Sequence, residues 1–313
     1  MDAGRVVFLG GLGRSGTTLL ERLLAQLPGV VALGEVVHLW ERGLRRNEPC
    51  GCGVAFLDCQ FWRNVGDRAF GGWDRLDVAE ILRRKRRVDR IRRIPWLACA
   101  AVPAARIGGR RSAVADYAHL YLRLYAAASA VSGRPVVIDS SKHASLAFCL
   151  RTADPAFRVA HVVRDSRGVA HSWAKRVERP EDGAPMTRWP PLRTGIHWLV
   201  ENLAFELLSR RGVPVTPVRY EELLRAPRAT LAHLAGKLGL RCDDGALDFV
   251  GTGHAELSVA HTVSGNPLRF RTGRVDLRSD QAWRSRLPRL QRATVTVLTW
   301  PLLSRYGYRG SPL

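Results

Sequence analysis

Short apolar runs alternate with longer amphipathic segments along most of the chain. The apolar runs lie at 5–11, 135–141, 157–165 and 213–220. Their Val-rich centres are typical of strands that are buried on both faces of a parallel sheet. Patterns with a helical period follow at 17–27, from His143, from Gly168, at 195–211 and at 226–239. Strands that alternate with helices predict an α/β fold, in which helices flank a parallel β-sheet.

Residues 40 to about 130 interrupt this alternation. They hold a turn rich in Cys and Gly, a strongly basic run and helical patterns near 75–95 and 113–132. We interpret them as a helical insertion that covers the sheet within a single domain of residues 1–313. Farther on, the Gly- and Arg-rich segment 262–274 predicts a loop, and helices are expected near 280 and at 290–305.

The chain is strongly basic, with a formal net charge of +21. Only four of the 49 basic residues are lysines, so a coding bias towards arginine accounts for part of this charge. The remainder favours an anionic partner: a nucleotide, a nucleic acid, an acidic glycan or a membrane surface. The first residues lead directly into a strand, and no apolar run has the ~20 residues of a membrane span. We therefore expect a cytoplasmic protein without a signal peptide.

A glycine-rich loop joins the first strand to the first helix, in the sequence GGLGRSGTT. The backbone N–H groups of residues 13–18 would lie at a helix N-terminus, which suits phosphate or sulfate. Arg14, Thr17 and Thr18 add side-chain donors for a tetrahedral anion. The loop therefore predicts a nucleotide site.

Three classes of nucleotide fit this loop. Its G-L-G-R-S-G at 11–16 matches the dinucleotide fingerprint of oxidoreductases, and Glu35 lies close to the position of the ribose-binding acid. The glycines also have the spacing of a P-loop kinase, and Asp139 is a candidate for the acid that holds Mg²⁺. However, Thr17 stands where a kinase has its Lys. The third class is a 5′-phosphosulfate nucleotide.

Polar residues at the ends of later strands narrow this choice. Lys142 comes directly after the run 135–141, Arg164 ends the next run, and Ser172 lies two turns into the helix that follows. Ligand sites of parallel α/β sheets form at the carboxyl ends of the strands. We therefore expect these side chains beside the glycine-rich loop.

In these motifs the chain resembles the sulfotransferases that use 3′-phosphoadenosine 5′-phosphosulfate (PAPS) as donor. The branch that it resembles most includes tyrosylprotein sulfotransferases and many bacterial small-molecule enzymes. The matching segments are 5–35, 136–176 and 195–285. The resemblance implies a sulfotransferase fold with a P-loop-type sheet and the insertion on its acceptor side. It also implies a set of donor-binding residues: Gly13, Arg14, Ser15, Gly16, Thr17, Thr18, Arg164 and Ser172.

The implied reaction is in-line transfer of a sulfuryl group to a hydroxyl of a small molecule, lipid or carbohydrate. Such a transfer needs cations and oriented donors, which we assign to Arg14 and Lys142. Lys142 and Glu35 stand where the resembled branch has its catalytic Lys and its base. Glu35 would take the proton of the acceptor, with His38 as the alternative base. We expect no metal in this chemistry, because the sulfuryl group carries less charge than a terminal phosphate.

Two other functions explain part of the sequence less completely than sulfuryl transfer does. A P-loop nucleotide kinase would explain the loop but lacks its Lys at position 17. A nucleic-acid-binding module would use the basic run 83–93. However, that run has no interleaved aromatic residues, and the chain shows no RNP, zinc-finger or homeodomain pattern. We expect no nucleic-acid partner.

Two features of the sequence are each compatible with several interpretations. Cys50, Cys52 and Cys59 fall within ten residues. They are compatible with zinc and one outside ligand, with a disulfide plus a thiol, or with small buried thiols in a tight turn. Residues 81–97 predict an amphipathic helix with Ile81, Val88, Ile91 and Pro95 near one face and Trp96 at its end. That helix fits plain solvation, peripheral contact with an anionic membrane, or binding of an acidic or lipid-linked acceptor.

Overall fold

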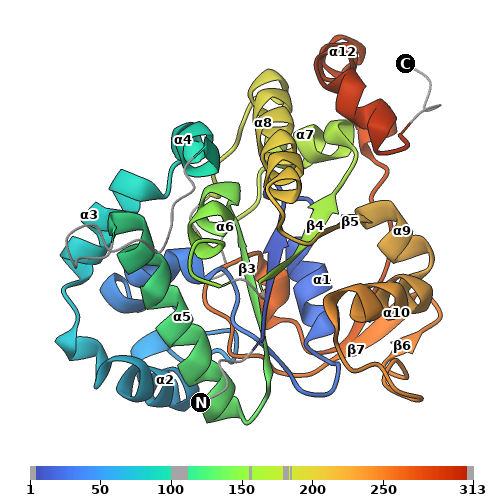
Figure 1. Ribbon diagram of the computed structural model, residues 1–313. Coiled ribbons are helices and arrows are strands. Elements are labelled where there is room, and N and C mark those ends of the chain that lie inside the picture. Colours follow the sequence, from blue (N-terminus) through green and yellow to red (C-terminus); the bar gives the residue numbers. More distant parts are fainter. Residues whose placement is uncertain (1–4, 100–111, 155–156, 179–182, 184, 309–313) are drawn as a thin grey trace.

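A parallel five-stranded sheet lies at the centre of the computed structural model, which describes residues 5–99, 112–154, 157–178, 183 and 185–308 (Figure 1). The strand order is β2-β3-β1-β4-β5. The strands are β1 (Arg5–Gly10), β2 (Val30–Ala32), β3 (Val136–Lys142), β4 (Arg158–Val163) and β5 (Val215–Arg219). The predicted α/β fold with a parallel sheet is confirmed, and each predicted strand is present.

The strand order separates this sheet from a dinucleotide-binding fold. There the second strand lies beside the first. Here β3 lies between them: β1 pairs with β3 on one side and with β4 on the other. The register places Gly10, the last residue of β1, beside Lys142 at the end of β3. The topology therefore argues against the dinucleotide interpretation of the loop and brings Lys142 next to it.

Alternate residues of β1 enter two different hydrophobic cores. Val6 and Phe8 pack in the first core, and Val7 and Leu9 pack in the second. The first core includes α5 (Ala113–Ser132), α6 (Ala144–Leu150) and α8 (Pro191–Arg210). The second includes α1 (Thr17–Leu24), α9 (Tyr220–Arg225) and α10 (Pro227–Leu238). Both faces of the sheet are thus covered, as the apolar strands predict.

The insertion packs into the first core. Trp40 and Trp62 are fully buried there, in the same cluster as Phe8 of β1. Its elements are η1 (Val36–His38), the π-helix η2 (Leu39–Arg45), η3 (Phe56–Asp58), α2 (Gln60–Phe70), η4 (Trp73–Arg75), α3 (Val78–Val88), η5 (Ile91–Arg93), α4 (Ile94–Cys99) and α5. The insertion and the sheet therefore share one core among the described residues; 100–111 lie outside them.

The helices of the insertion match their predictions unevenly. α5 has the predicted bounds. The helix expected over 75–95 is instead divided at Asp89, whose buried carboxylate accepts hydrogen bonds from Tyr117 and Ser145 and ends α3. α2 was not predicted at all. A polar contact between distant segments thus ended a helix that the local pattern would have continued.

The C-terminal part contains a small sheet that the sequence did not predict. It is antiparallel, with β6 (Val250–Gly251), β7 (His254–Leu257) and β8 (Gly273–Asp276). The loop expected at 262–274 is therefore only partly correct, because η6 (Pro267–Phe270) and the start of β8 fall within it. α7 (Ser166–Ala174), α11 (Trp283–Arg286) and α12 (Arg289–Arg305) complete the fold.

α12 is the packed C-terminal helix that the sequence predicts, and it continues through Pro301. Its Leu302 and Leu303 pack with Trp198 of α8 in a third cluster. Within the described residues, none of the helices combines the length and the apolar character that crossing a membrane demands.

Candidate functional site

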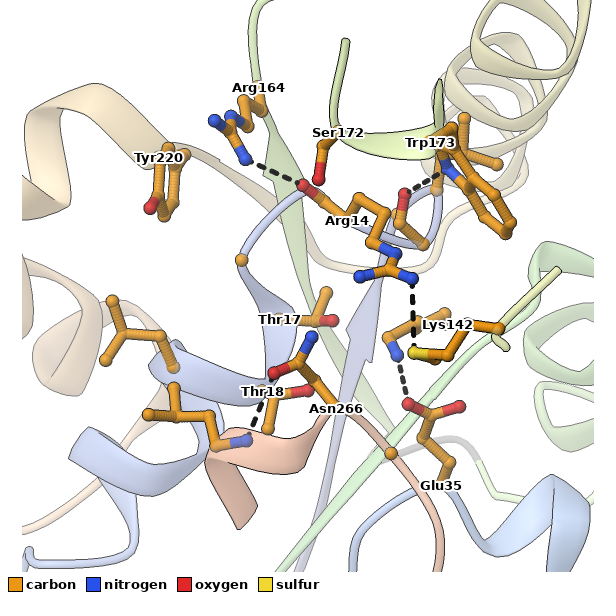
Figure 2. Close-up of a pocket in the computed structure, with 18 of the residues that line it drawn as sticks. Arg14, Thr17, Thr18, Glu35, Lys142, Arg164, Ser172, Trp173, Tyr220 and Asn266 are labelled. Atoms are coloured by element: carbon orange, nitrogen blue, oxygen red, sulfur yellow. Dashed lines mark hydrogen bonds and ion pairs between the residues drawn. The ribbon is translucent and has the colours of Figure 1, made fainter. Parts of the chain in front are cut away.

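A cavity of about 830 Å³ opens at the carboxyl ends of the parallel strands (Figure 2). The structure brings to its wall nine of the predicted residues: Gly13, Arg14, Gly16, Thr17, Thr18, Glu35, Lys142, Arg164 and Ser172. Ser15 is different, because the residue is 1% exposed and its backbone N–H donates to the Leu12 carbonyl. It supports the turn of the loop from behind.

The glycine-rich loop depends on glycine at position 16. Gly16 has φ of 98°, and a Cβ atom there would lie 2.3 Å from the ring of Tyr220. It is also the N-cap of α1 and leaves the first turn of the helix without a side-chain cap. The N–H groups that follow it, at Thr17 and Thr18, therefore remain available to an anion in the cavity.

Arg14 projects from this loop over the centre of the cavity (Figure 2). Its backbone has φ of 73°, and its guanidinium lies 5.6 Å from the ring centroid of Trp173 and donates to Met186 Sδ at 3.2 Å. Burial lowers the pKa of Arg14, and the nearby Glu35 carboxylate opposes this shift. The contacts with Trp173 and Met186 hold the cation in place without neutralising it, so its charge stays available to a ligand.

Arg164 and Ser172 form a second polar region beside the loop. Arg164 directly follows β4, is 7% exposed, and donates to the Arg14 carbonyl at 3.1 Å. Its guanidinium lies 4.6 Å from the ring centroid of Tyr220. Ser172 reaches the same wall from α7 (Figure 2). The predicted pair is therefore together, and Tyr220 is a third member that the sequence reasoning missed.

Glu35 and Lys142 form an ion pair on the other side of the loop. Lys142 ends β3 in a left-handed conformation, φ 72°, and its Nζ donates to Glu35 Oε1 (Figure 2). Glu35 stands at the N-cap of η1, but its side chain makes no capping bond. Its backbone N–H donates to the Val263 carbonyl at 2.8 Å. The carboxylate is thus directed to the cavity rather than used as a cap.

His38 lies beside this ion pair. Its Nε2 is 3.6 Å from Glu35 Oε2, and its ring meets that of His143 edge to face at 5.7 Å. Burial, with a smaller contribution from Lys85, lowers the pKa of His38 well below its usual value. A neutral imidazole can accept a proton at neutral pH, so both predicted bases are present in the cavity wall.

Asp139 is not placed to hold a metal ion for a kinase reaction. It is fully buried and lies outside the cavity wall. It accepts hydrogen bonds from the Tyr125 hydroxyl and from the backbone N–H of Ser141, at 2.5 and 2.7 Å. Burial raises the pKa of Asp139 to about 7. Because its oxygens are engaged inside the fold, the kinase alternative loses its candidate for the acid that holds Mg²⁺.

Two solved structures have this architecture over nearly their whole length. One is the sulfotransferase domain from the olefin synthase of Synechococcus PCC 7002, with TM-score 0.50 and 20% identity, covering 95% of this chain and 93% of that one. The other is the sulfotransferase domain from the curacin biosynthetic pathway, with TM-score 0.50 and 15% identity, covering 96% and 97%. The fold is that of a sulfotransferase domain. No family model and no curated protein matches the sequence.

The cavity wall also contains residues that the sequence analysis does not predict. Trp173 and Trp189 stack face to face, with centroids 3.9 Å apart. Glu201, in the middle of α8, accepts from the Ala144 N–H at 3.3 Å, and burial raises its pKa to about 7. Tyr220 directly follows β5, so the strand-end rule that selected Lys142 also points to it. No sequence signal marks Glu201 or Trp189.

Proposed function

We propose that this protein is a PAPS-dependent sulfotransferase that moves the sulfuryl group to a hydroxyl of a small molecule, lipid or carbohydrate. The observation that carries the proposal is the convergence of three polar groups on one cavity: the glycine-rich loop, the Arg164–Ser172 pair and the Glu35–Lys142 pair. The sulfotransferase fold supports it.

Each part of the donor has matching chemistry in the wall. The loop N–H groups and Arg14 suit the 5′-phosphosulfate, and Arg164 with Ser172 suits the 3′-phosphate. Apolar residues beside Tyr220 offer a surface for the base: Leu19, Leu224, Leu268 and Val275. The donor would therefore lie across the loop, with its sulfuryl end towards Lys142.

The transfer step follows from these positions. The acceptor oxygen attacks sulfur in line, a new S–O bond forms, and the bond from sulfur to the phosphate oxygen of the donor breaks. Arg14 and Lys142 would stabilise the charge on the sulfuryl oxygens and on the departing phosphate. Glu35 would receive the acceptor proton, and 3′-phosphoadenosine 5′-phosphate (PAP) would leave. Donor binding would draw Lys142 from Glu35 and so free a carboxylate for this role.

PAP is expected to raise the melting temperature of the protein, whereas NAD and ATP with Mg²⁺ raise it far less. PAP carries a 5′-phosphate for the glycine-rich loop and a 3′-phosphate for Arg164 and Ser172, whereas NAD and ATP lack the 3′-phosphate. The ligand that binds the folded protein more tightly stabilises it more. Arg164→Ala is expected to weaken PAP binding about 10- to 100-fold, since a buried charge-assisted contact is lost. Arg241→Ala is the control, because Arg241 is exposed and pairs with Asp243, two residues away. Titration calorimetry and thermal shift measure both effects, and stronger stabilisation by NAD than by PAP contradicts the proposal.

The acceptor can be identified by labelling. With ³⁵S-labelled PAPS and a metabolite extract of the host, the wild type is expected to transfer label to a hydroxyl compound. The Lys142→Met variant serves as the inactive control. Label found only on inorganic sulfate in every extract would contradict group transfer to an acceptor.

We also propose peripheral contact of segment 81–97 with anionic membranes. Of the residues expected on its apolar face, Ile81 and Val88 are buried, whereas Pro95 is exposed. Trp96 is 52% exposed at its end. α4 contacts α8, which has its own row of exposed apolar side chains: Leu192, Ile196, Val200 and Leu203. Exposed arginines beside exposed apolar groups suit a surface of anionic lipid.

Co-sedimentation with liposomes tests this contact. Binding is expected to vesicles containing phosphatidylserine or phosphatidylglycerol but not to neutral vesicles, and to decline with salt, since each basic residue contributes about 1 kcal/mol near such a surface. Gln substitution of four exposed arginines is expected to abolish it: Arg86, Arg87, Arg92 and Arg93. The matched control replaces four basic residues around α10 with Gln: Arg225, Arg228, Lys237 and Arg241. No binding even at low salt would contradict the membrane contact and leave 81–97 as a solvated basic segment.

A further inference from the structure

Three cysteines of the insertion and one distant histidine bring their ligand atoms together. The sulfurs of Cys50, Cys52 and Cys59 and a ring nitrogen of His261 all lie within 4.8 Å of one another. Cys50 and Cys59 are buried, while Cys52 and His261 are partly exposed. His261 is separated from Cys59 by 202 positions in the sequence, so the fold and not a local motif creates this group.

The distances between the four ligand atoms match those around a single tetrahedral metal ion. The Cys59 sulfur lies 3.7 Å from the Cys50 sulfur and 3.8 Å from the Cys52 sulfur. His261 Nδ1 lies 3.3 Å from the Cys59 sulfur and 3.8 Å from the Cys50 sulfur. Zinc bonds of about 2.3 Å to sulfur and about 2.0–2.1 Å to nitrogen give tetrahedron edges of about 3.8 and 3.6 Å. The four atoms therefore already stand near the corners of a zinc site.

A disulfide explains the group less well. It would join one pair of sulfurs at about 2.05 Å and leave the third as a thiol. Here the sulfur of Cys59 lies at nearly equal distances from the sulfurs of Cys50 and Cys52, so no pair is selected, and the cysteines are free. A group of plain buried thiols does not explain His261 either, because its Nδ1 is directed at two sulfurs rather than at an oxygen acceptor.

The backbone around the cysteines is built for sulfur ligands. An antiparallel bridge between Pro49 and Ala55 closes a tight turn, in which Gly53 adopts a positive φ of 90°. The backbone N–H of Cys50 donates to the Val54 carbonyl at 2.7 Å, and the N–H of Gly53 donates to the Cys50 carbonyl at 2.8 Å. Cys59 is the N-cap of α2, where the helix dipole favours negative charge on its sulfur. A tight turn and a helix N-terminus thus fix the cysteines close together and favour a thiolate at Cys59.

His261 is held from the other side. Its ring stacks on Phe61 with centroids 5.0 Å apart, and a cavity of about 290 Å³ lined by both residues gives access to it. The next residue, Thr262, accepts from the Gly51 N–H at 2.8 Å. Val263 then accepts from the Glu35 N–H, also at 2.8 Å. The group thus joins the cysteine turn to the segment that positions Glu35.

From this geometry we infer that Cys50, Cys52, Cys59 and His261 bind one structural zinc ion. All four ligand positions come from the protein, so no site is left open for a substrate or a water, and the ion takes no part in sulfuryl transfer. Its function is to fix the turn and the 261–266 segment against the Glu35 side of the cavity. This inference is independent of the proposed function, because metal binding is measured without turnover.

The first experiment measures metal content and ligand chemistry in the full-length protein without an affinity tag. Inductively coupled plasma mass spectrometry is expected to find about one zinc per chain in protein from cells grown with added zinc. Reduced apoprotein is expected to bind Co²⁺ with the absorption of a tetrahedral thiolate site, and Zn²⁺ is expected to displace it. Removing the zinc is expected to lower the melting temperature by at least about 5 °C.

Variants then test the ligand set. Cys52→Ala and His261→Ala are expected to lose the zinc, whereas Cys242→Ala, outside the group, keeps it. His261→Cys is expected to keep one zinc with four sulfur ligands, a result that stacking on Phe61 alone does not predict. If His261→Ala retains full zinc, the four-ligand site is wrong. Wild-type protein that binds neither Zn²⁺ nor Co²⁺ after reduction, or that contains a disulfide among these cysteines, also overturns the inference.

Discussion

Glu35→Gln is expected to lower kcat by about 10²- to 10⁴-fold, the range associated with loss of a general base. The amide is nearly the same size as the carboxylate, so it keeps the contact distance to Lys142 but cannot take the acceptor proton. PAP affinity is expected to change less than about threefold, because the donor regions lie on the other side of the loop. Release of PAP under single-turnover conditions and PAP binding by calorimetry measure the two quantities separately.

His38→Ala provides the comparison for this experiment. Its Nε2 lies only 3.6 Å from Glu35, and the lowered pKa keeps the ring neutral at neutral pH. If Glu35 is the base, the His38 variant is expected to lose no more than about tenfold, since only an orienting contact is removed. Near-normal turnover of Glu35→Gln together with a collapse in His38→Ala would assign the base to His38 instead.

Lys142→Met is expected to lower kcat by about 10²- to 10³-fold, comparable to the loss of one strong donor to a developing negative charge. Met keeps much of the length and the apolar stem of the side chain while removing the charge. Lys237→Met is the matched control, since Lys237 is an exposed lysine outside the cavity wall. A turnover assay under saturating donor measures this effect, and unchanged kcat would remove Lys142 from the mechanism.

The double variant adds a test of the ion pair itself. Residues that act together on one transition state show strongly non-additive effects. Glu35→Gln with Lys142→Met is therefore expected to lose far less than the product of the two single losses. If the reduction in kcat of the double variant equals the product of the two single reductions, the two side chains act independently, despite the direct contact between Lys142 Nζ and Glu35 Oε1.

Much of the cavity could be predicted because parallel strands end at one edge. Lys142 ends β3 beside Gly10, and Arg164 directly follows β4 and donates to the Arg14 carbonyl, so both lie beside the glycine-rich loop. Each residue was selected by its position after a strand, not by its surroundings. The assignment of Glu35 to a catalytic role stays a prediction. The structure adds that its side chain is not used as a helix cap and faces Lys142.

The remaining features depend on contacts that no local pattern contains. Glu201 is one polar residue within a helix and reaches the wall only because α8 packs beside α6. His261 joins the cysteines across 202 positions, and the three cysteines alone left their state open. The break after α3 reflects buried hydrogen bonds of Asp89 with Tyr117 and Ser145. In each case the partner residue, far away in sequence, decides the local structure.

The shared core of the insertion and the sheet limits how the protein can be engineered. Trp40 and Trp62 pack in the same cluster as Phe8, so the insertion cannot be exchanged as an independent unit. Transplanting it into another scaffold would leave large aromatic side chains without their complementary surface, and a foreign segment here would leave voids of several side chains. For the proposed transfer, acceptor preference is better altered by single replacements in the cavity wall, at positions such as Met186, Trp189 or His197.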